Sequence, residues 1–290
     1  MRVEEPNEIV RHGARRVRRK VKIAQNQRAH RSASHSTLCL RATVRLLQRI
    51  VEDPHPCAYL PKEAASLEVR VMLDVTTEEL GTMLARGWRR FGPCYFRPQC
   101  QACEACVTLR IRVDEFRPTR SQRRARNRAA RLQRVVSRPS VDDARIALYR
   151  KWHKEREGAR GWEPSPLRAD RYALDFAFPH PSAREAAYYD GDELVGIGLF
   201  DDTPDALSAV YFFYDPDLKR DSLGVANVVA LVDDARRAKK PYVYLGYRVL
   251  GCDSLEYKSD FVPHELLSVR PREDENPAWA EHLAPRNRIA

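Results

Sequence analysis

The most constraining feature of the chain is a run of alternating segments followed by an amphipathic helix and one more strand. Residues 186–190, 194–200 and 207–214 read as strands, and turn signals at 190–192 and 201–204 separate them, which predicts an antiparallel meander. A helix over 225–240 follows, and Pro241 ends it before a strand over 242–246. Its predicted apolar face consists of Val228, Val229, Leu231, Val232, Ala235 and Ala238.

The first half of the chain mixes helix and strand patterns. Residues 66–73 and 108–113 alternate with period two and predict strands. Residues 76–86 predict a helix that Thr76 or Thr77 caps, and 88–97 predict a strand kinked at Gly92-Pro93. Helical spacing returns over 141–157 and 167–176, while 38–51 fit either a helix or a strand. Together with the meander, these patterns predict the α+β class.

Positive charge is concentrated in two segments. The net charge is +11, yet residues 10–35 and 117–138 each hold nine Lys/Arg and no Asp/Glu, so the remainder carries −7. A basic balance of this kind points to nucleic acid or a membrane surface as the partner. No apolar run approaches a membrane span and no secretory signal is evident, so we expect a cytoplasmic protein and no membrane partner.

The two basic segments predict different roles. The first lies in residues 1–37, which have little apolar periodicity and which we expect to be a disordered tail. The second lies within the folded part, and arginine suits bidentate contacts with phosphate. Nine like charges repel one another unless an anion compensates them, so we expect phosphate binding there, with a solvated face as the alternative.

Three cysteines are spaced as in a metal-binding loop, in the pattern Cys100-x-x-Cys103-x-x-Cys106. A tight loop can turn thiolates at this spacing toward one centre, and a fourth ligand completes a tetrahedral site. Cys57 is the first candidate for that ligand and Cys94 the second. Zinc, an iron–sulfur cluster and free thiols all stay open.

Several strings of the chain together resemble the aminoacyl-tRNA–protein transferase family, which contains arginyltransferases and bacterial aspartate/glutamate leucyltransferases. The match runs in order from about residue 38 to residue 267. The strings are Cys57-Ala58-Tyr59-Leu60-Pro61, Gly87-Trp88-Arg89-Arg90-Phe91-Gly92, Tyr95-Phe96-Arg97-Pro98 with the cysteine pattern, Phe116-Arg117-Pro118-Thr119-Arg120-Ser121-Gln122-Arg123-Arg124, Ser208-Ala209-Val210-Tyr211, Phe213-Tyr214-Asp215-Pro216-Asp217, Ser222-Leu223-Gly224, Tyr244-Leu245-Gly246-Tyr247 and Tyr257-Lys258.

This resemblance implies the transfer of an amino acid from charged tRNA to the N-terminus of a protein, which marks that protein for degradation. It implies an N-terminal cysteine-containing α/β domain over 38–138 and an acetyltransferase-like domain over 139–270, followed by a polar, irregular tail over 271–290. The acceptors implied are proteins with acidic N-termini. Leucyl-tRNA is the expected donor because the chain is as compact as the bacterial branch, and arginyl-tRNA is the alternative. The oligomeric state stays open.

The chemistry assigns expected roles to named residues. Because the donor ester is already activated, positioning and proton transfer suffice, and we expect no cofactor to be required for the reaction. The predicted tRNA contacts are Arg120, Ser121, Gln122, Arg123 and Arg124, with Ser222 and Gly224 at a helix N-terminus. The predicted catalytic and pocket residues are Asp215, Tyr211, Tyr247, Tyr257 and Lys258.

Two alternatives accompany these roles. Arg156 or Lys258 is the expected cation for an acidic acceptor residue, while Asp215 before Pro216 also fits an ordinary turn. A metal-containing RNA-binding module without catalysis is the competing function. The tyrosine-rich second half argues against it, since a pure binding module does not need those residues.

Overall fold

The computed structural model describes residues 44–160 and 168–282. The predicted tail at 1–37 lies outside these ranges. A smaller, four-stranded sheet opens the fold, with the strand order β1-β4-β6-β5. Its strands are β1 (Arg45–Val51), β4 (Leu67–Leu73), β5 (Arg89–Phe91) and β6 (Cys94–Pro98), and the short pair β2 (His55–Pro56) and β3 (Ala64–Ala65) lies between β1 and β4 in the sequence.

Local sequence signals account for most of this sheet. Helix α3 (Thr77–Ala85) begins as predicted at Thr76, whose hydroxyl accepts from Glu79 N in a complete capping box. The predicted single strand over 88–97 is wrong, because β5 and β6 form an antiparallel hairpin around Gly92. Gly92 has a φ of 52°, and a Cβ there would lie 2.0 Å from Leu174 O, so only glycine fits this turn.

The larger sheet has eight strands in the order β14-β13-β7-β12-β11-β10-β9-β8. Every neighbouring pair is antiparallel except β11 and β12, which are parallel. The predicted meander is confirmed as β9–β10–β11, and the fold is a mixed α and β arrangement. The strands are β7 (Val107–Arg112), β8 (Gln133–Ser137), β9 (Ala183–Asp190), β10 (Glu193–Asp202), β11 (Ala206–Tyr214), β12 (Tyr242–Arg248), β13 (His264–Leu267) and β14 (Ala280–His282).

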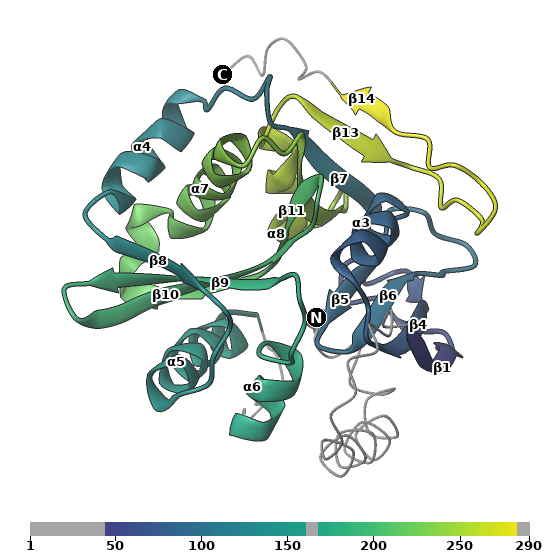
Figure 1. Cartoon of the computed structure of the whole chain (residues 1–290), viewed down its shortest axis with the longest axis horizontal. Coiled ribbons are helices and arrows are strands. Elements are labelled where there is room, and N and C mark those ends of the chain that lie inside the picture. Colours follow the sequence, from purple (N-terminus) through teal and green to yellow (C-terminus); the bar gives the residue numbers. More distant parts are fainter. Residues whose placement is uncertain (1–43, 161–167, 283–290) are drawn as a thin grey trace, which may run out of the picture.

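Helices cover both faces of this sheet (Figure 1). Helix α7 (Leu223–Arg237) connects β11 to β12 through the 3-10 turn η1 (Pro216–Asp221), and α4 (Arg120–Ala129) packs beside it. Helices α5 (Asp143–Arg160) and α6 (Ala169–Asp175) lie on the opposite face. The predicted apolar face of α7 is confirmed except at Ala238, which is exposed because it caps the helix.

The large sheet takes strands from both sides of residue 138. Strand β7, from the predicted N-terminal domain, lies between β12 and β13. The predicted irregular tail after residue 270 contains the strand β14, which pairs with β13, so that prediction is wrong for those residues. Between β12 and β13 lie α8 (Asp253–Glu256) and the 3-10 turn η2 (Tyr257–Asp260). Each described helix is too short or too polar to cross a membrane.

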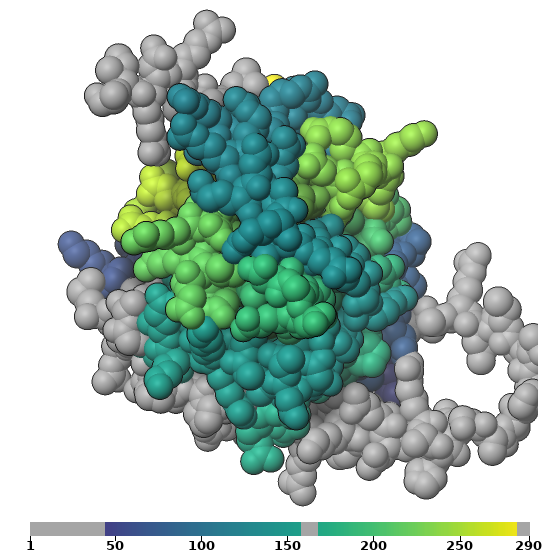
Figure 2. Space-filling model, turned by 90° about the vertical axis from the view of Figure 1, so that its left-hand side faces the viewer, coloured from purple at the N-terminus to yellow at the C-terminus, as the bar shows by residue number. Residues whose placement is uncertain are grey.

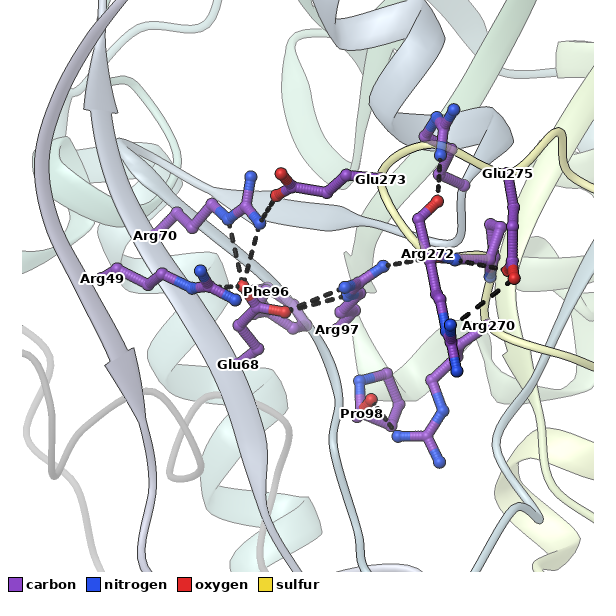
Figure 3. A network of polar contacts seen from close by, with 12 residues as sticks. Arg49, Glu68, Arg70, Phe96, Arg97, Pro98, Arg270, Arg272, Glu273 and Glu275 are labelled. Carbon is purple, nitrogen blue, oxygen red and sulfur yellow. Dashed lines mark hydrogen bonds and ion pairs between the residues drawn. The ribbon is translucent and has the colours of Figure 1, made fainter.

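A network of charges fastens the segment after residue 270 to the small sheet (Figure 3). Glu68, 2% exposed, receives hydrogen bonds from Arg70 and Arg97 and an ion pair from Arg49. Arg70 also pairs with Glu273. Burial opposes ionisation of Glu68, yet these arginines lower its pKa below the usual value. The network therefore joins the segment after residue 270 to strands β4 and β6 of the small sheet.

Candidate active site

The parallel pair β11 and β12 opens into a cleft. The two strands pair only from Ala206↔Tyr242 to Ser208↔Tyr244, although β11 continues to Tyr214 and β12 to Arg248. Beyond the paired end they separate, and residues of both line a cavity of about 590 Å³. A volume of this size falls within the usual range of small-molecule and cofactor sites. This large cavity is the candidate active site.

Residues from both the first and the second half of the chain line the large cavity. The small sheet contributes Arg89, Phe91 and Phe96, while α5 contributes Trp152 and Arg156. The start of α7 and the segment around η2 complete the lining with Ser222, Gly224, Val225, Tyr257 and Lys258. The cavity thus lies where the two sheets meet, a common position for ligand sites.

Arg89 is a buried cation in this cavity that sequence reasoning missed. It is 7% exposed, and its Nη1 donates to Ser208 Oγ at 3.0 Å. Its Nε and Nη2 have no hydrogen-bond partner among the described residues. Burial lowers the pKa of this guanidinium. The only signal in the sequence was a pair of arginines between two aromatic residues, Trp88 and Phe91.

Lys258 is the second cation within the large cavity. Its Nζ donates to Tyr247 O at 2.9 Å, and no carboxylate pairs with it in the described part of the chain. Burial, helped by the charge of Arg89, lowers the pKa of Lys258 to about 7. A lysine of this kind is largely neutral slightly above pH 7 and can accept a proton.

The predicted tyrosines divide between lining and structural positions. Tyr211, Tyr247 and Tyr257 line the large cavity, as predicted for a pocket. The Tyr247 hydroxyl donates to Gly87 O at 2.9 Å, so it also joins the two sheets. Burial raises the pKa of Tyr247, which keeps its hydroxyl protonated. Tyr244 packs on Trp279 and does not line the cavity.

Asp215 lies outside the large cavity. Its side chain accepts from Asp217 N and forms an ion pair with Lys151 at 2.7 Å, so it caps η1 as a turn-forming residue. The structure does not bring this carboxylate to the other predicted catalytic residues. A role for Asp215 toward the substrate amine stays a prediction.

The predicted tRNA contacts lie on α4, at the outer surface of the molecule (Figures 1 and 2). Arg120, Arg123 and Arg124 are exposed and form no ion pair with any described carboxylate. Ser121 is exposed beside them. Gln122 is instead buried, because it completes the capping box with Thr119 and donates to Asp260 O. Gln122 therefore stabilises the helix and does not belong to its exposed face.

A smaller cavity of about 330 Å³ lies between this helix and the start of α7, next to the large cavity. Its lining includes Arg124 and Arg128 of α4, and it shares Ser222, Val225 and Tyr257 with the large cavity. Ser222 has a φ of 56° and caps α7 without a side-chain cap bond, while its hydroxyl accepts from Arg128. Gly224 lines the large cavity at the same helix end. The predicted phosphate-binding residues are thus contiguous.

The remaining predicted site residue, Arg156, is half-buried against Trp152 in the wall of the large cavity. Its guanidinium carbon lies 5.1 Å from the centroid of the Trp152 ring, within cation–π range. The structure thereby brings Arg156 into the same cavity as Lys258, as expected for two alternative cations.

The four predicted metal ligands neighbour one another. Cys57, Cys100 and Cys103 all raise the pKa of Cys106, which burial raises first, to about 12. Cys57 Sγ accepts from Tyr59 N and Leu60 N at 3.4 Å, an arrangement that suits a thiolate. No three potential ligands within residues 44–160 and 168–282 converge at metal-binding geometry. Cys94, the second candidate, lies buried near Asp175 and Arg171 instead.

Comparisons with known proteins agree with this geometry. The model of the arginine-tRNA-protein transferase family matches residues 55–124 as its N terminus and residues 144–268 as its C terminus. An aspartate/glutamate leucyltransferase from Campylobacter jejuni is 33% identical over 73% of this chain and 89% of its own length. One from Pseudomonas aeruginosa is 36% identical over 74% of this chain and 91% of its own length. The chain therefore belongs to the arginine-tRNA-protein transferase family.

Structural similarity beyond the family is weaker. The structure of L-PGS from Bacillus licheniformis aligns with 60% of this chain and 50% of that chain, at 14% identity and a TM-score of 0.39. This level of similarity does not test the predicted acetyltransferase-like fold.

Proposed function

We propose that this protein transfers leucine from charged tRNA to the N-terminal Asp or Glu of acceptor proteins in the cytoplasm, marking them for degradation. The observation that carries the proposal is that the smaller cavity, which Arg124 of α4 lines, is adjacent to the large cavity and shares three lining residues with it. The relatives named as aspartate/glutamate leucyltransferases favour leucine over arginine as the donor amino acid.

In this proposal the tRNA approaches across α4. Arg120, Arg123 and Arg124 contact backbone phosphates, and the 3′ end passes Ser222 toward the large cavity. Backbone N–H groups near Gly224 face the end of the acceptor stem at the start of α7. The terminal adenosine and the aminoacyl group enter the large cavity, where Tyr211 and Tyr257 offer aromatic surface for stacking.

The reaction needs one proton acceptor and one proton donor. The acceptor α-amine attacks the ester carbonyl, a C–N amide bond forms, and the C–O bond to the ribose breaks. Neutral Lys258 takes the proton that the α-amine loses, and the same proton passes to the departing ribose oxygen. Holding the two substrates in this cavity supplies most of the remaining acceleration.

We also propose that the second half has an acetyltransferase-like arrangement. Its support is the parallel pair β11 and β12, which α7 connects and which separates around the large cavity. No acetyl-CoA pyrophosphate loop is evident in the sequence, so the cleft serves another donor in this proposal.

The cysteine cluster is proposed as a metal or iron–sulfur site on Cys57, Cys100, Cys103 and Cys106. The donor set fits in its chemistry, since four thiols lie near one another and one accepts two backbone N–H groups. Such a group would brace the loop after β6, and no step of the transfer passes through it. Metal analysis and a visible absorption spectrum of anaerobically purified protein distinguish zinc, an iron–sulfur cluster and free thiols.

The test of the function is incorporation of labelled leucine or arginine from charged tRNA into peptides that begin with Asp or Glu. We expect leucine transfer. Transfer of arginine alone would show that the protein uses arginyl-tRNA as its donor, as the arginyltransferases of the family do. Intact tRNA binding without transfer of either amino acid would favour the non-catalytic RNA-binding module.

A further inference from the structure

Two buried N–H groups of the Arg89 side chain are available to bind a ligand. A buried charge in a folded protein normally has a charged or hydrogen-bonded partner, because water no longer solvates it. Within residues 44–160 and 168–282, Arg89 meets one acceptor, Ser208 Oγ, and its Nε and Nη2 have no hydrogen-bond partner. The only carboxylate that lines the large cavity belongs to Asp201, and Arg90 already binds it, with Nε 3.0 Å from Oδ1. No carboxylate that lines the cavity therefore hydrogen-bonds to Arg89, although the charge of Asp201 acts on it from a distance.

The free donors have the shape of a carboxylate site. Nε–H and Nη2–H point from the same edge of a guanidinium and match the two oxygens of one carboxylate. The contact from Nη1 to Ser208 fixes the opposite side of the group, while the rings of Tyr244 and Tyr247 lie 5.3 and 5.9 Å from its central carbon. The free edge is thus held in position before any ligand arrives.

Lys258 lies next to this edge. Both cations flank Gly246, at which an added Cβ would lie 3.5 Å from Lys258 Nζ and 3.9 Å from Arg89 Nε. Gly246 has a φ of 80°, so the strand presents bare backbone between the two nitrogens. A single small residue that carries an amine and a carboxylate a few bonds apart can therefore reach both groups.

We propose that Arg89 binds the side-chain carboxylate of the acceptor's N-terminal Asp or Glu and thereby selects acidic acceptors. This inference rests on the proposed function. The carboxylate receives two hydrogen bonds from the free edge of Arg89, and the adjacent α-amine faces Lys258. Arg89, rather than Arg156, is the specificity residue, because Arg156 lies half-buried on Trp152 while Arg89 is buried with unmet donors.

The experiment compares leucine transfer to two peptides that differ only in an N-terminal Asp or Asn. We expect the wild type to prefer Asp by about 100-fold in kcat/KM, because the Asn amide carries no negative charge and its NH2 group would face the N–H donors of Arg89. In Arg89→Gln this preference falls to within a few-fold, mainly by loss of the Asp peptide. Arg70→Gln removes an arginine outside the cavity and serves as the matched control, with its preference unchanged.

Thermal melting separates binding from folding. Because no carboxylate in the described part of the chain hydrogen-bonds to Arg89, Arg89→Gln should melt no lower than the wild type, while an Asp peptide should raise the melting temperature of the wild type alone. Should the variant fail to fold, Arg89→Lys keeps the positive charge but cannot form the bidentate hydrogen bonds of a guanidinium. We expect its preference for the Asp peptide to drop at least tenfold.

Three outcomes would overturn the inference while leaving the function intact. An Arg89→Gln enzyme that retains the full preference for Asp removes Arg89 from acceptor selection. Equal losses for both peptides, with a raised KM for tRNA, assign Arg89 to a tRNA phosphate. A preference lost in Arg156→Gln but kept in Arg89→Gln assigns the role to Arg156. Failure of the wild type to transfer to either peptide would instead overturn the proposed function.

Discussion

Two basic regions of this protein differ in the surroundings of their charges. On α4, Arg120, Arg123 and Arg124 project into solvent, where salt screens each charge. In the large cavity, Arg89 and Lys258 are held between aromatic walls and the backbone at Gly246. Exposed charges of the first kind give affinity that depends on salt and carries little selectivity. Buried charges of the second kind can discriminate between substrates, because removing a partner leaves an unmet polar group.

The strongest test of this difference is Lys258→Met. If the buried lysine takes the proton from the acceptor amine, kcat falls by roughly 100-fold or more, the usual contribution of a general base. The measurement is steady-state leucine transfer at saturating peptide, with tRNA affinity measured in parallel. Affinity should stay within about twofold. A kcat near that of the wild type would remove Lys258 from the chemistry.

The complementary test removes exposed charge. Replacing Arg120, Arg123 and Arg124 by Ala should weaken tRNA binding by about 30-fold, which corresponds to roughly 0.7 kcal/mol for each exposed contact. The slope of log affinity against log salt should become shallower by roughly 2 to 3, because tRNA binding releases fewer counterions when these phosphate contacts are missing. kcat at saturating tRNA should remain unchanged.

A charge-matched control isolates the position of these charges. Arg126, Arg131 and Arg237 are exposed, but each pairs with a carboxylate. Their triple replacement by Ala removes the same charge and should change the salt slope by less than about 1. If the two triple variants weaken tRNA equally, net charge rather than the free face of α4 governs binding.

A third test uses pH to connect the two cavity cations. The pKa of Lys258 is lowered to about 7, so its neutral form increases as pH rises, and kcat should climb about tenfold from pH 6 to a plateau above pH 8. The charge of Arg89 lowers this pKa, while the thiols of Cys252 and Cys106 raise it. Arg89→Gln should therefore move the midpoint to higher pH. If the midpoint does not move, the charge of Arg89 does not influence the group whose titration governs kcat.

The sequence predicted what local rules decide. Period-two strands, the capping box at Thr76 and the apolar face of α7 follow from short-range spacing, and all three are present. The large cavity depends instead on contacts between distant segments. Arg89 meets Ser208 from the other sheet, 119 residues along the chain, and no local pattern distinguishes it from Arg90, which pairs with Asp201. Asp215 is the opposite case, in which a local pattern accounts for the position of the residue. Its carboxylate, predicted to be catalytic, instead accepts from Asp217 N and pairs with Lys151 in the turn that the sequence also predicted.

The smallest effect is expected from deleting residues 1–37. Nine of the basic residues in this chain lie between positions 10 and 35, as many as lie between 117 and 138. If charge alone determined tRNA binding, this deletion, which removes ten Lys/Arg and three Glu and hence a net charge of +7, would cost more than the triple α4 replacement, which removes +3. We expect kcat to stay within about twofold and tRNA affinity to fall only at low salt, where long-range attraction is unscreened. A tenfold loss of kcat after the deletion would place part of the active site in those residues, and a tenfold loss of tRNA affinity at moderate salt would show that charge position on α4 does not by itself explain tRNA binding.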